Sequence, residues 1–111
     1  KSHMPNPYLI ALCSNRLASC YLAQHRIDEA NIFFHRALIH AQVEEHAHLK
    51  SYHLISKIYR NMAQLSMLTN DPRSSKKALT KALALCPPSK PHTLLSILFI
   101  IIEFYLFVEK D

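Results

Sequence analysis

The chain has 111 residues, which is enough for one small domain and too few for two. Half of the residues are apolar, which excludes a disordered chain, and the complete absence of glycine disfavours β-hairpins and excludes the glycine loops that bind phosphate. The formal net charge of +5 permits an acidic partner without requiring one.

The first residues resemble a sequence introduced by cloning. Ser-His-Met at positions 2–4 matches a common cloning scar, so we expect residues 1–4 to be an expression scar. Residues 5–111 are then expected to form a single helical domain that is a fragment of a longer protein.

The three cysteines are Cys13, Cys20 and Cys86, an odd number without CxxC spacing. This usage favours reduced thiols in a cytoplasmic or nuclear protein. We expect these side chains to be small buried residues rather than a redox pair.

The first half of the chain predicts two helices. Asn6 is a candidate N-cap with Pro7 at the first helical position, and apolar residues then recur at helical spacing as far as Tyr21. The segment QHRID at 24–28 breaks this pattern, and Asp28 is a candidate cap for the second helix. That helix weakens around the segment EEHAH, and its apolar positions are Ala30, Ile32, Phe33, Phe34, Ala37, Leu38 and Ala41.

The second half predicts three more helices. The third covers about 49–68 and ends at TNDP, 69–72, in which Asp71 is the candidate cap of the fourth. The fourth ends before CPPSKP at 86–91, and the fifth, about 91–109, is the most apolar segment of the chain. The sequence therefore predicts an all-α fold of about five helices with short loops and no strand.

Small and aromatic residues recur with a period of 45 residues. The first unit is marked by Ala18, Tyr21, Ala30, Phe34 and Ala37. Forty-five residues later stand, in the same order, Ala63, Ser66, Ser75, Leu79 and Ala82. Leu17 likewise becomes Met62, and Pro87 closes the second unit. Such recurrence in register predicts two copies of one structural unit.

This pattern resembles the tetratricopeptide repeat (TPR) over roughly residues 9–87. The resemblance implies antiparallel helical hairpins at about 7–45 and 48–86, stacked as a short TPR-like solenoid. Antiparallel helices approach closely only where side chains are small. We therefore expect Ala18 and Ala30 at the contact of the first hairpin, with the aromatic residues Tyr21 and Phe34 packing its seam.

The chain departs from the usual TPR pattern in two respects. Its period of 45 residues exceeds the usual length of about 34, as in an extended-period variant, and Ala18 stands where glycine is usual. Armadillo- or HEAT-like hairpins, with periods of about 40–47 residues, are an alternative. A plain antiparallel helical bundle is another.

The last helix is nearly continuous apolar sequence over residues 93–108. A membrane span is disfavoured because the run is shorter than about 20 residues and contains Glu103. A helix that is apolar all round is usually buried on several sides. We expect it to pack on a second copy of the chain or on the rest of the protein, through Ile97, Ile101, Phe104 and Val108.

The eight histidines raise the question of a metal site. Four of them, near the second loop, are His40, His46, His48 and His53. No cysteine is near them and the HExxH motif is absent, so they are interpreted as solvated loop residues and no metal or cofactor is predicted. The acidic residues form no catalytic constellation, and we expect the protein not to be an enzyme.

Basic residues form two stripes at helical spacing. One is expected on the fourth helix and consists of Arg73, Lys76, Lys77 and Lys81. The other, on the third helix, consists of Lys50, Lys57 and Arg60. These stripes are either solvated surface or the wall of a groove for an acidic peptide. Nucleic acid is a less favoured ligand, because no exposed aromatic residues are interleaved with these cations.

The resemblance implies a protein–protein scaffold or adaptor in the cytoplasm or nucleus, which binds a peptide or helix of a larger complex on the concave face built by the first helices of the hairpins. The residues expected to line this face are Asn15, Arg16, Ser19, Lys57, Arg60 and Asn61. Some TPR domains clamp a terminal carboxylate there with asparagine and lysine. Asn15 and Asn61 are near the right places, but Ser14 and Ser19 stand where lysine would be needed.

Overall fold

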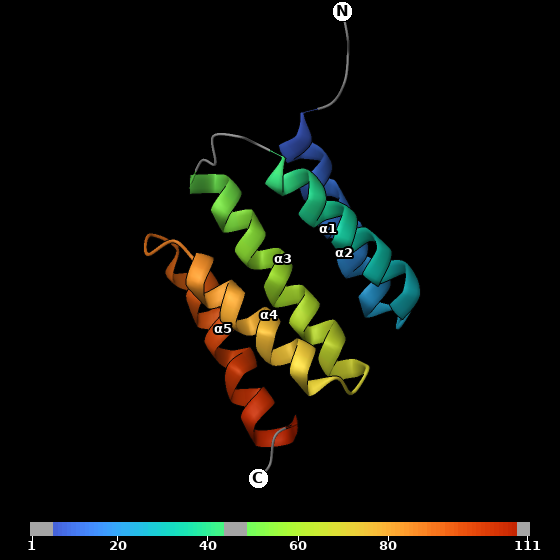
Figure 1. The fold of residues 1–111 in the computed structure, drawn as a ribbon, viewed down its shortest axis with the longest axis vertical. Helices are drawn as coiled ribbons and strands as arrows, with labels where there is room; N and C mark the ends of the chain where they lie inside the picture. The colour runs from blue at the N-terminus through green and yellow to red at the C-terminus, as the bar shows by residue number, and fades with distance from the viewer. Residues whose placement is uncertain (1–5, 44–48, 109–111) are drawn as a thin grey trace, which may run out of the picture.

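A computed structural model describes residues 6–43 and 49–108, and this part of the chain contains five α-helices and no strand. The helices are α1 (Pro7–Ala23), α2 (Ile27–Gln42), α3 (Leu49–Leu68), α4 (Pro72–Leu85) and α5 (Pro91–Glu103), and a π-helical turn (Phe104–Val108) continues α5 (Figure 1). The predicted all-α fold is confirmed. The expected scar at 1–4 and the histidines at 46 and 48 lie outside the described residues.

Local capping chemistry sets where most of the helices begin. Asn6 accepts a hydrogen bond from the Tyr8 amide at 2.7 Å, and Asp71 accepts one from the Ser74 amide at 3.1 Å, as N-caps do. Proline stands at the start of α1, α4 and α5. The expected cap at Asp28 is wrong, because α2 begins one residue earlier and Asp28 lies inside its first turn.

The two helix-to-helix turns have the same geometry 45 residues apart. His25 and Asn70 both adopt the left-handed conformation, with φ of 60° and 61°. The amide that follows each of them donates to a carbonyl five residues back, Arg26 to Tyr21 and Asp71 to Ser66, both at 2.9 Å. This is the Schellman motif, which usually employs glycine at the left-handed position. A chain without glycine repeats it with histidine and asparagine.

Small side chains allow the helices of each hairpin to touch. Completely buried are Ala18, Ala30 and Ala37 in the first hairpin and, 45 residues later, Ala63, Ser75 and Ala82 in the second. Ser75 Oγ donates to the Ala63 carbonyl at 3.4 Å, and Ser56 Oγ donates to the Ala82 carbonyl at 2.7 Å. The second hairpin thus replaces two buried alanine positions with serines that bond across the helix contact.

The aromatic residues of the first hairpin divide between core and rim. Phe34 is completely buried, as expected, and its counterpart Leu79 is nearly so. Tyr21 is only half-buried, and its ring stacks on Phe33 with 5.6 Å between the ring centroids. Tyr21 therefore lies at the edge of the seam beside Phe33 instead of filling it with Phe34.

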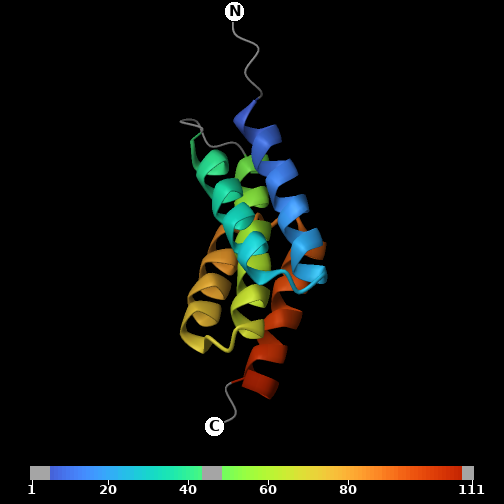
Figure 2. The same cartoon turned by 90° about the vertical axis from the view of Figure 1, so that its right-hand side faces the viewer.

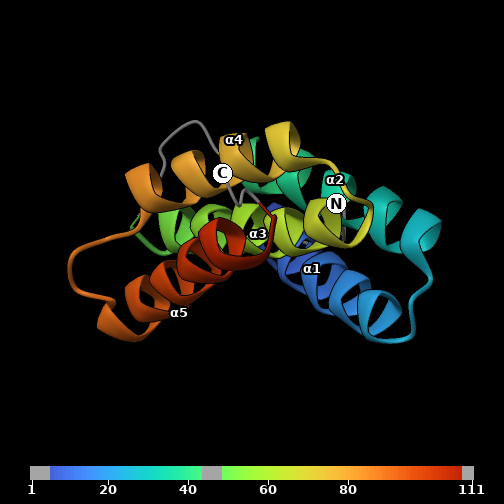
Figure 3. The ribbon, with the colours of Figure 1, turned by 90° about the horizontal axis from the view of Figure 1, so that it is seen from below.

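The helices form two layers. Seen from below, α2 and α4 lie on one side, and α1, α3 and α5 on the other (Figure 3). The perpendicular view shows α2 and α4 on one side, α1 and α5 on the other, and α3 between these two pairs (Figure 2). The side of the molecule shared by α1, α3 and α5 contains a hollow lined by Leu22, Gln64 and Glu103, one from each helix, and is called the concave face below.

The inner side of α5 belongs to the core. Ile97 and Phe104 are almost completely buried, while Ile101 and Val108 are half-buried against the same cluster. These four residues, expected to form a self-association surface, instead attach α5 to the rest of the chain. The exposed apolar residues of α5, such as Leu95, Phe99 and Ile102, lie on the opposite side of the helix.

Candidate binding face

The structure brings the predicted binding residues of α1 and α3 together on the concave face. Asn61 Nδ2 donates to Asn15 Oδ1 at 3.1 Å and to Ser19 Oγ at 3.4 Å. Ser19 Oγ in turn donates to the Asn15 carbonyl at 3.0 Å. Asn15 and Asn61 are both buried, with only 7% of each residue's surface exposed to solvent. Since they bond to each other, these two residues link the hairpins and are not free to receive a ligand.

Arg60 connects α3 to α5. Its Nε and Nη2 donate to Asn61 Oδ1 at 3.3 and 3.1 Å, and its Nη1 donates to Ser96 Oγ at 3.2 Å. Partial burial lowers the pKa of Arg60 below its ordinary value. All of these acceptors are neutral, so the guanidinium keeps an uncompensated positive charge at the floor of the concave face.

His53 forms a second link between α3 and α5. Its Nε2 lies 2.7 Å from Thr93 Oγ1. Burial lowers the pKa of His53, and the charges of Lys57, Lys90 and Arg60 lower it further. The sequence placed this residue in a loop, but it lies within α3 because the helix begins at Leu49, four residues before it.

Lys57 lies among other cations. Burial lowers its pKa first, followed by the positive charges of Arg60, Arg16 and Lys90, in that order. Among the described residues, an exposed ion pair joins Arg26 and Glu29 at 2.9 Å. It includes none of the cations around Lys57. Arg16, Lys57, Arg60 and Lys90, with His53 beside them, are called the cation cluster below.

Two hollows continue the concave face toward the C-terminal ends of its helices. The first, of about 450 Å³, lies between α3 and α5 and is lined by Gln64, His92, Leu95, Ser96, Phe99, Ile100 and Glu103. The second, of about 360 Å³, is more apolar and is lined by Leu22, Gln64, Met67, Leu68, Glu103 and Val108. The face is therefore cationic in its middle and apolar toward one end.

Sequence reasoning found only part of this face. Arg16, Lys57 and Arg60 were expected there and belong to the cation cluster. Lys90, Thr93 and Ser96 come from the last segment, which was interpreted by its apolarity alone. The signal that was available is the polar residues of α5 at 93 and 96, three residues apart on one side of the helix.

The basic stripe predicted on α4 does not act as one patch. Lys76 lies over the ring of Tyr105 in the π-helical turn after α5, with Nζ 5.8 Å from the centroid. Lys81 lies over the Tyr59 ring of α3 at 5.3 Å, and Lys77 also faces that side. Arg73 is exposed at the start of the helix. The four cations therefore lie on different sides of α4.

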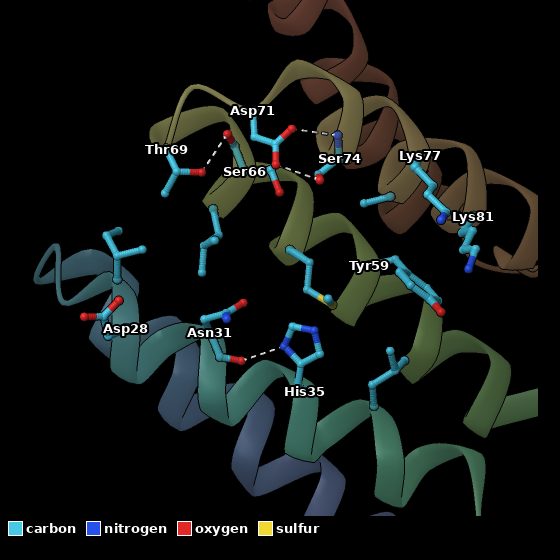
Figure 4. A pocket seen from close by; sticks show the side chains of 15 residues that line it. Asp28, Asn31, His35, Tyr59, Ser66, Thr69, Asp71, Ser74, Lys77 and Lys81 are labelled. Atoms are coloured by element: carbon cyan, nitrogen blue, oxygen red, sulfur yellow. Dashed lines mark hydrogen bonds between the residues drawn. The ribbon is translucent and has the colours of Figure 1, made fainter.

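A pocket of about 600 Å³ opens between α2 and α4 on the opposite side of the molecule (Figure 4). Asp28 and Asp71 border one end, and Lys77 and Lys81 the other. Some polar groups of its walls bond within their own segments: Asp71 Oδ2 accepts from Ser74 Oγ at 2.8 Å, and His35 Nδ1 lies 2.9 Å from the Asn31 carbonyl.

The remaining reactive residues are dispersed. No group of three or more histidine, cysteine or acidic side chains is placed to hold a metal ion within the residues the structure covers. Cys13 and Cys20 are exposed, contrary to the expectation that they would be buried, and Cys86 is half-buried.

No protein-family model, curated protein or solved structure matches this chain.

Proposed function

We propose that this chain is a TPR-like interaction module that binds an acidic segment of a partner protein on its concave face. The observation that carries the proposal is the cation cluster. Burial lowers the pKa of Lys57, and three further cations from α1, α3 and the loop before α5, namely Arg60, Arg16 and Lys90, lie close enough to lower it further. No ion pair of the described residues neutralises these four side chains.

A carboxylate bound beside Lys57 and Arg60 would relieve the electrostatic repulsion between these cations. Like charges that share a partly buried site destabilise one another, and an anion placed between them forms charge-assisted hydrogen bonds. Arg60 already has its orientation determined by Asn61 and Ser96, so little side-chain entropy remains to be lost when a ligand binds.

The neighbouring hollows define the rest of the ligand. If an acidic residue of a peptide binds at the cation cluster, the residues that follow it reach the apolar hollow lined by Leu22, Met67 and Leu68. The preferred ligand is therefore a short segment with acidic residues at one end and large apolar residues at the other. Such a segment belongs to a protein, and the module is a scaffold or adaptor and not an enzyme.

A binding assay tests this proposal. The probe is a fluorescein-labelled peptide with a run of glutamates followed by leucines, compared with a scrambled peptide of the same composition. We expect anisotropy to report binding that weakens with salt and that Lys57→Met weakens by at least about tenfold, because a charge-assisted bond is lost. The matched control is Lys77→Met on α4, which removes the same charge and is expected to leave binding unchanged.

The same assay distinguishes the alternative of a nucleic-acid-associated subunit. A labelled single-stranded RNA oligonucleotide that binds, and is weakened by Lys77→Met as much as by Lys57→Met, would favour that alternative. Equal peptide affinity in the wild type and in Lys57→Met would contradict the proposed site.

A further inference from the structure

The outward side of α5, together with the π-helical turn that continues it, carries an uncovered apolar stripe. Its central members are each more than half exposed and stand at i, i+4, i+7 and i+11: Leu95, Phe99, Ile102 and Leu106. Leu98, 38% exposed, lies beside them. Residues at this spacing share one side of a helix, so they form a continuous surface.

The position of α5 explains why this stripe is bare. Helix α1 packs along its length against α2, and α3 packs in the same way against α4. Helix α5 touches α3 and α4 on its inner side, and no described helix lies along its outer side (Figure 3). A single stripe repeating every three or four residues is the pattern by which one helix packs against another.

A lipid bilayer is a poor occupant of this surface. The stretch Pro91–Val108, 18 residues, is long and apolar enough to cross a membrane. Crossing would require α5 to leave the fold, withdrawing the buried Ile97 and Phe104 from the core and breaking the bonds of Thr93 to His53 and of Ser96 to Arg60. The helix is thus held on the protein with only one side available.

We infer that the stripe is covered by the same stripe of a second copy of this chain, in a symmetric dimer. None of its five side chains is charged, so two stripes meet without the repulsion that the net charge of +5 would produce elsewhere. Five large side chains with about half of their surface exposed offer roughly 500 Å² per copy. A symmetric pair therefore buries roughly 1,000 Å², the size at which specific interfaces begin.

This surface is separable from the proposed peptide site. Leu95 and Phe99 also border a hollow of the concave face, whereas Ile102 and Leu106 line neither of its hollows. A change at Ile102 therefore tests the dimer alone, and its outcome is independent of peptide binding through Lys57.

The test is sedimentation equilibrium of the full chain between about 1 and about 100 μM. We expect a mass approaching twice 12.8 kDa that persists in high salt, since the contact is apolar. Ile102→Glu is expected to raise the dimer dissociation constant by about 100-fold, because both copies then place a carboxylate in the contact. The matched control is Ile32→Glu on α2, 57% exposed against 54% for Ile102, which should leave the constant unchanged.

Ile102→Gln provides an uncharged second variant, and circular dichroism checks that both variants keep their helices. A monomer across the whole concentration range, or equal effects of Ile102→Glu and Ile32→Glu, would overturn the dimer. So would co-flotation of the wild-type chain, as a monomer, with phosphatidylcholine vesicles, which would assign the stripe to a membrane.

Discussion

At the scale of single residues, His53 reports on the electrostatics of the concave face. It lies on α3 and contacts Thr93 of α5, and its burial, followed by the charges of three nearby cations, lowers its pKa. Burial lowers the pKa of Lys57 as well, and Arg60, Arg16 and Lys90 lower it further. A neutral imidazole is tolerated in this position, while an imidazolium would add a further positive charge to the cluster.

The depressed pKa of His53 predicts a loss of stability in acid. Since the unfolded chain titrates near 6.5 and the folded chain below it, the unfolded chain binds the proton more readily. The stability that neutral His53 contributes is complete above 6.5 and is lost as the pH falls toward the folded pKa. Urea unfolding at about pH 7.5 and about pH 5.5 measures this loss.

His53→Gln is expected to reduce this dependence on pH, because the glutamine does not titrate. The comparison is His35→Gln on the exposed side of α2, which should retain the slope of the wild type. A slope that is the same for His53→Gln and the wild type would contradict the assignment.

At the scale of elements, the two turns show that backbone geometry can recur without its usual residue. His25 and Asn70 have φ near 60°, in a region where a side chain is unfavourable. Asparagine tolerates this region better than histidine does. The hydrogen bonds of the Schellman motif hold both residues there, because the helices on either side are already packed against each other.

Glycine at these turns is therefore expected to stabilise the protein. His25→Gly should raise the free energy of unfolding by about 1 kcal/mol, because the left-handed conformation no longer strains a Cβ, and Asn70→Gly should raise it by less. Chemical denaturation provides the measurement. The control is Gln24→Gly, one residue earlier with φ of −91°, which should destabilise or leave stability unchanged. Destabilisation by His25→Gly would exclude strain at this turn.

At the scale of the whole molecule, the cation cluster and the bare stripe adjoin each other, since Leu95 and Phe99 of the stripe also border a hollow of the concave face. The cation cluster occupies the hollow between α1, α3 and α5, and the bare stripe lies on the outside of α5. Both are unfavourable for an isolated chain. A surface that costs stability in the free state and is relieved by binding is the usual property of an interaction site.

A stability measurement tests this view of the cluster. Lys57→Met keeps the length of the side chain, removes one of the mutually repelling charges and avoids the burial of an ammonium group. We expect its melting temperature to rise, while its affinity for the acidic peptide falls. Lys77→Met, at an exposed position on α4, should change neither property. A lower melting temperature in Lys57→Met would show that the charge contributes to the fold.

The sequence by itself determined the helices and their pairing. Local signals are sufficient for these features: Asn6 and Asp71 cap their helices, prolines start three of them, and alanines 45 residues apart mark the contacts of both hairpins. The assignment to a named repeat family is still a prediction. Where a local signal was weak, as at Asp28, the expected N-cap was displaced by two residues from the observed one, Arg26.

Only the tertiary structure decided which sides of the helices face one another. An all-round apolar segment has no polar side to orient it, so Ile97 and Phe104 were predicted outside although they lie inside. Asn15 and Asn61 were predicted to meet a partner, but they are 46 residues apart and meet each other. The cation cluster combines residues of three segments, and their charges add only when the hairpins are stacked. Such contacts between distant residues depend on packing geometry, which periodicity along the chain does not encode.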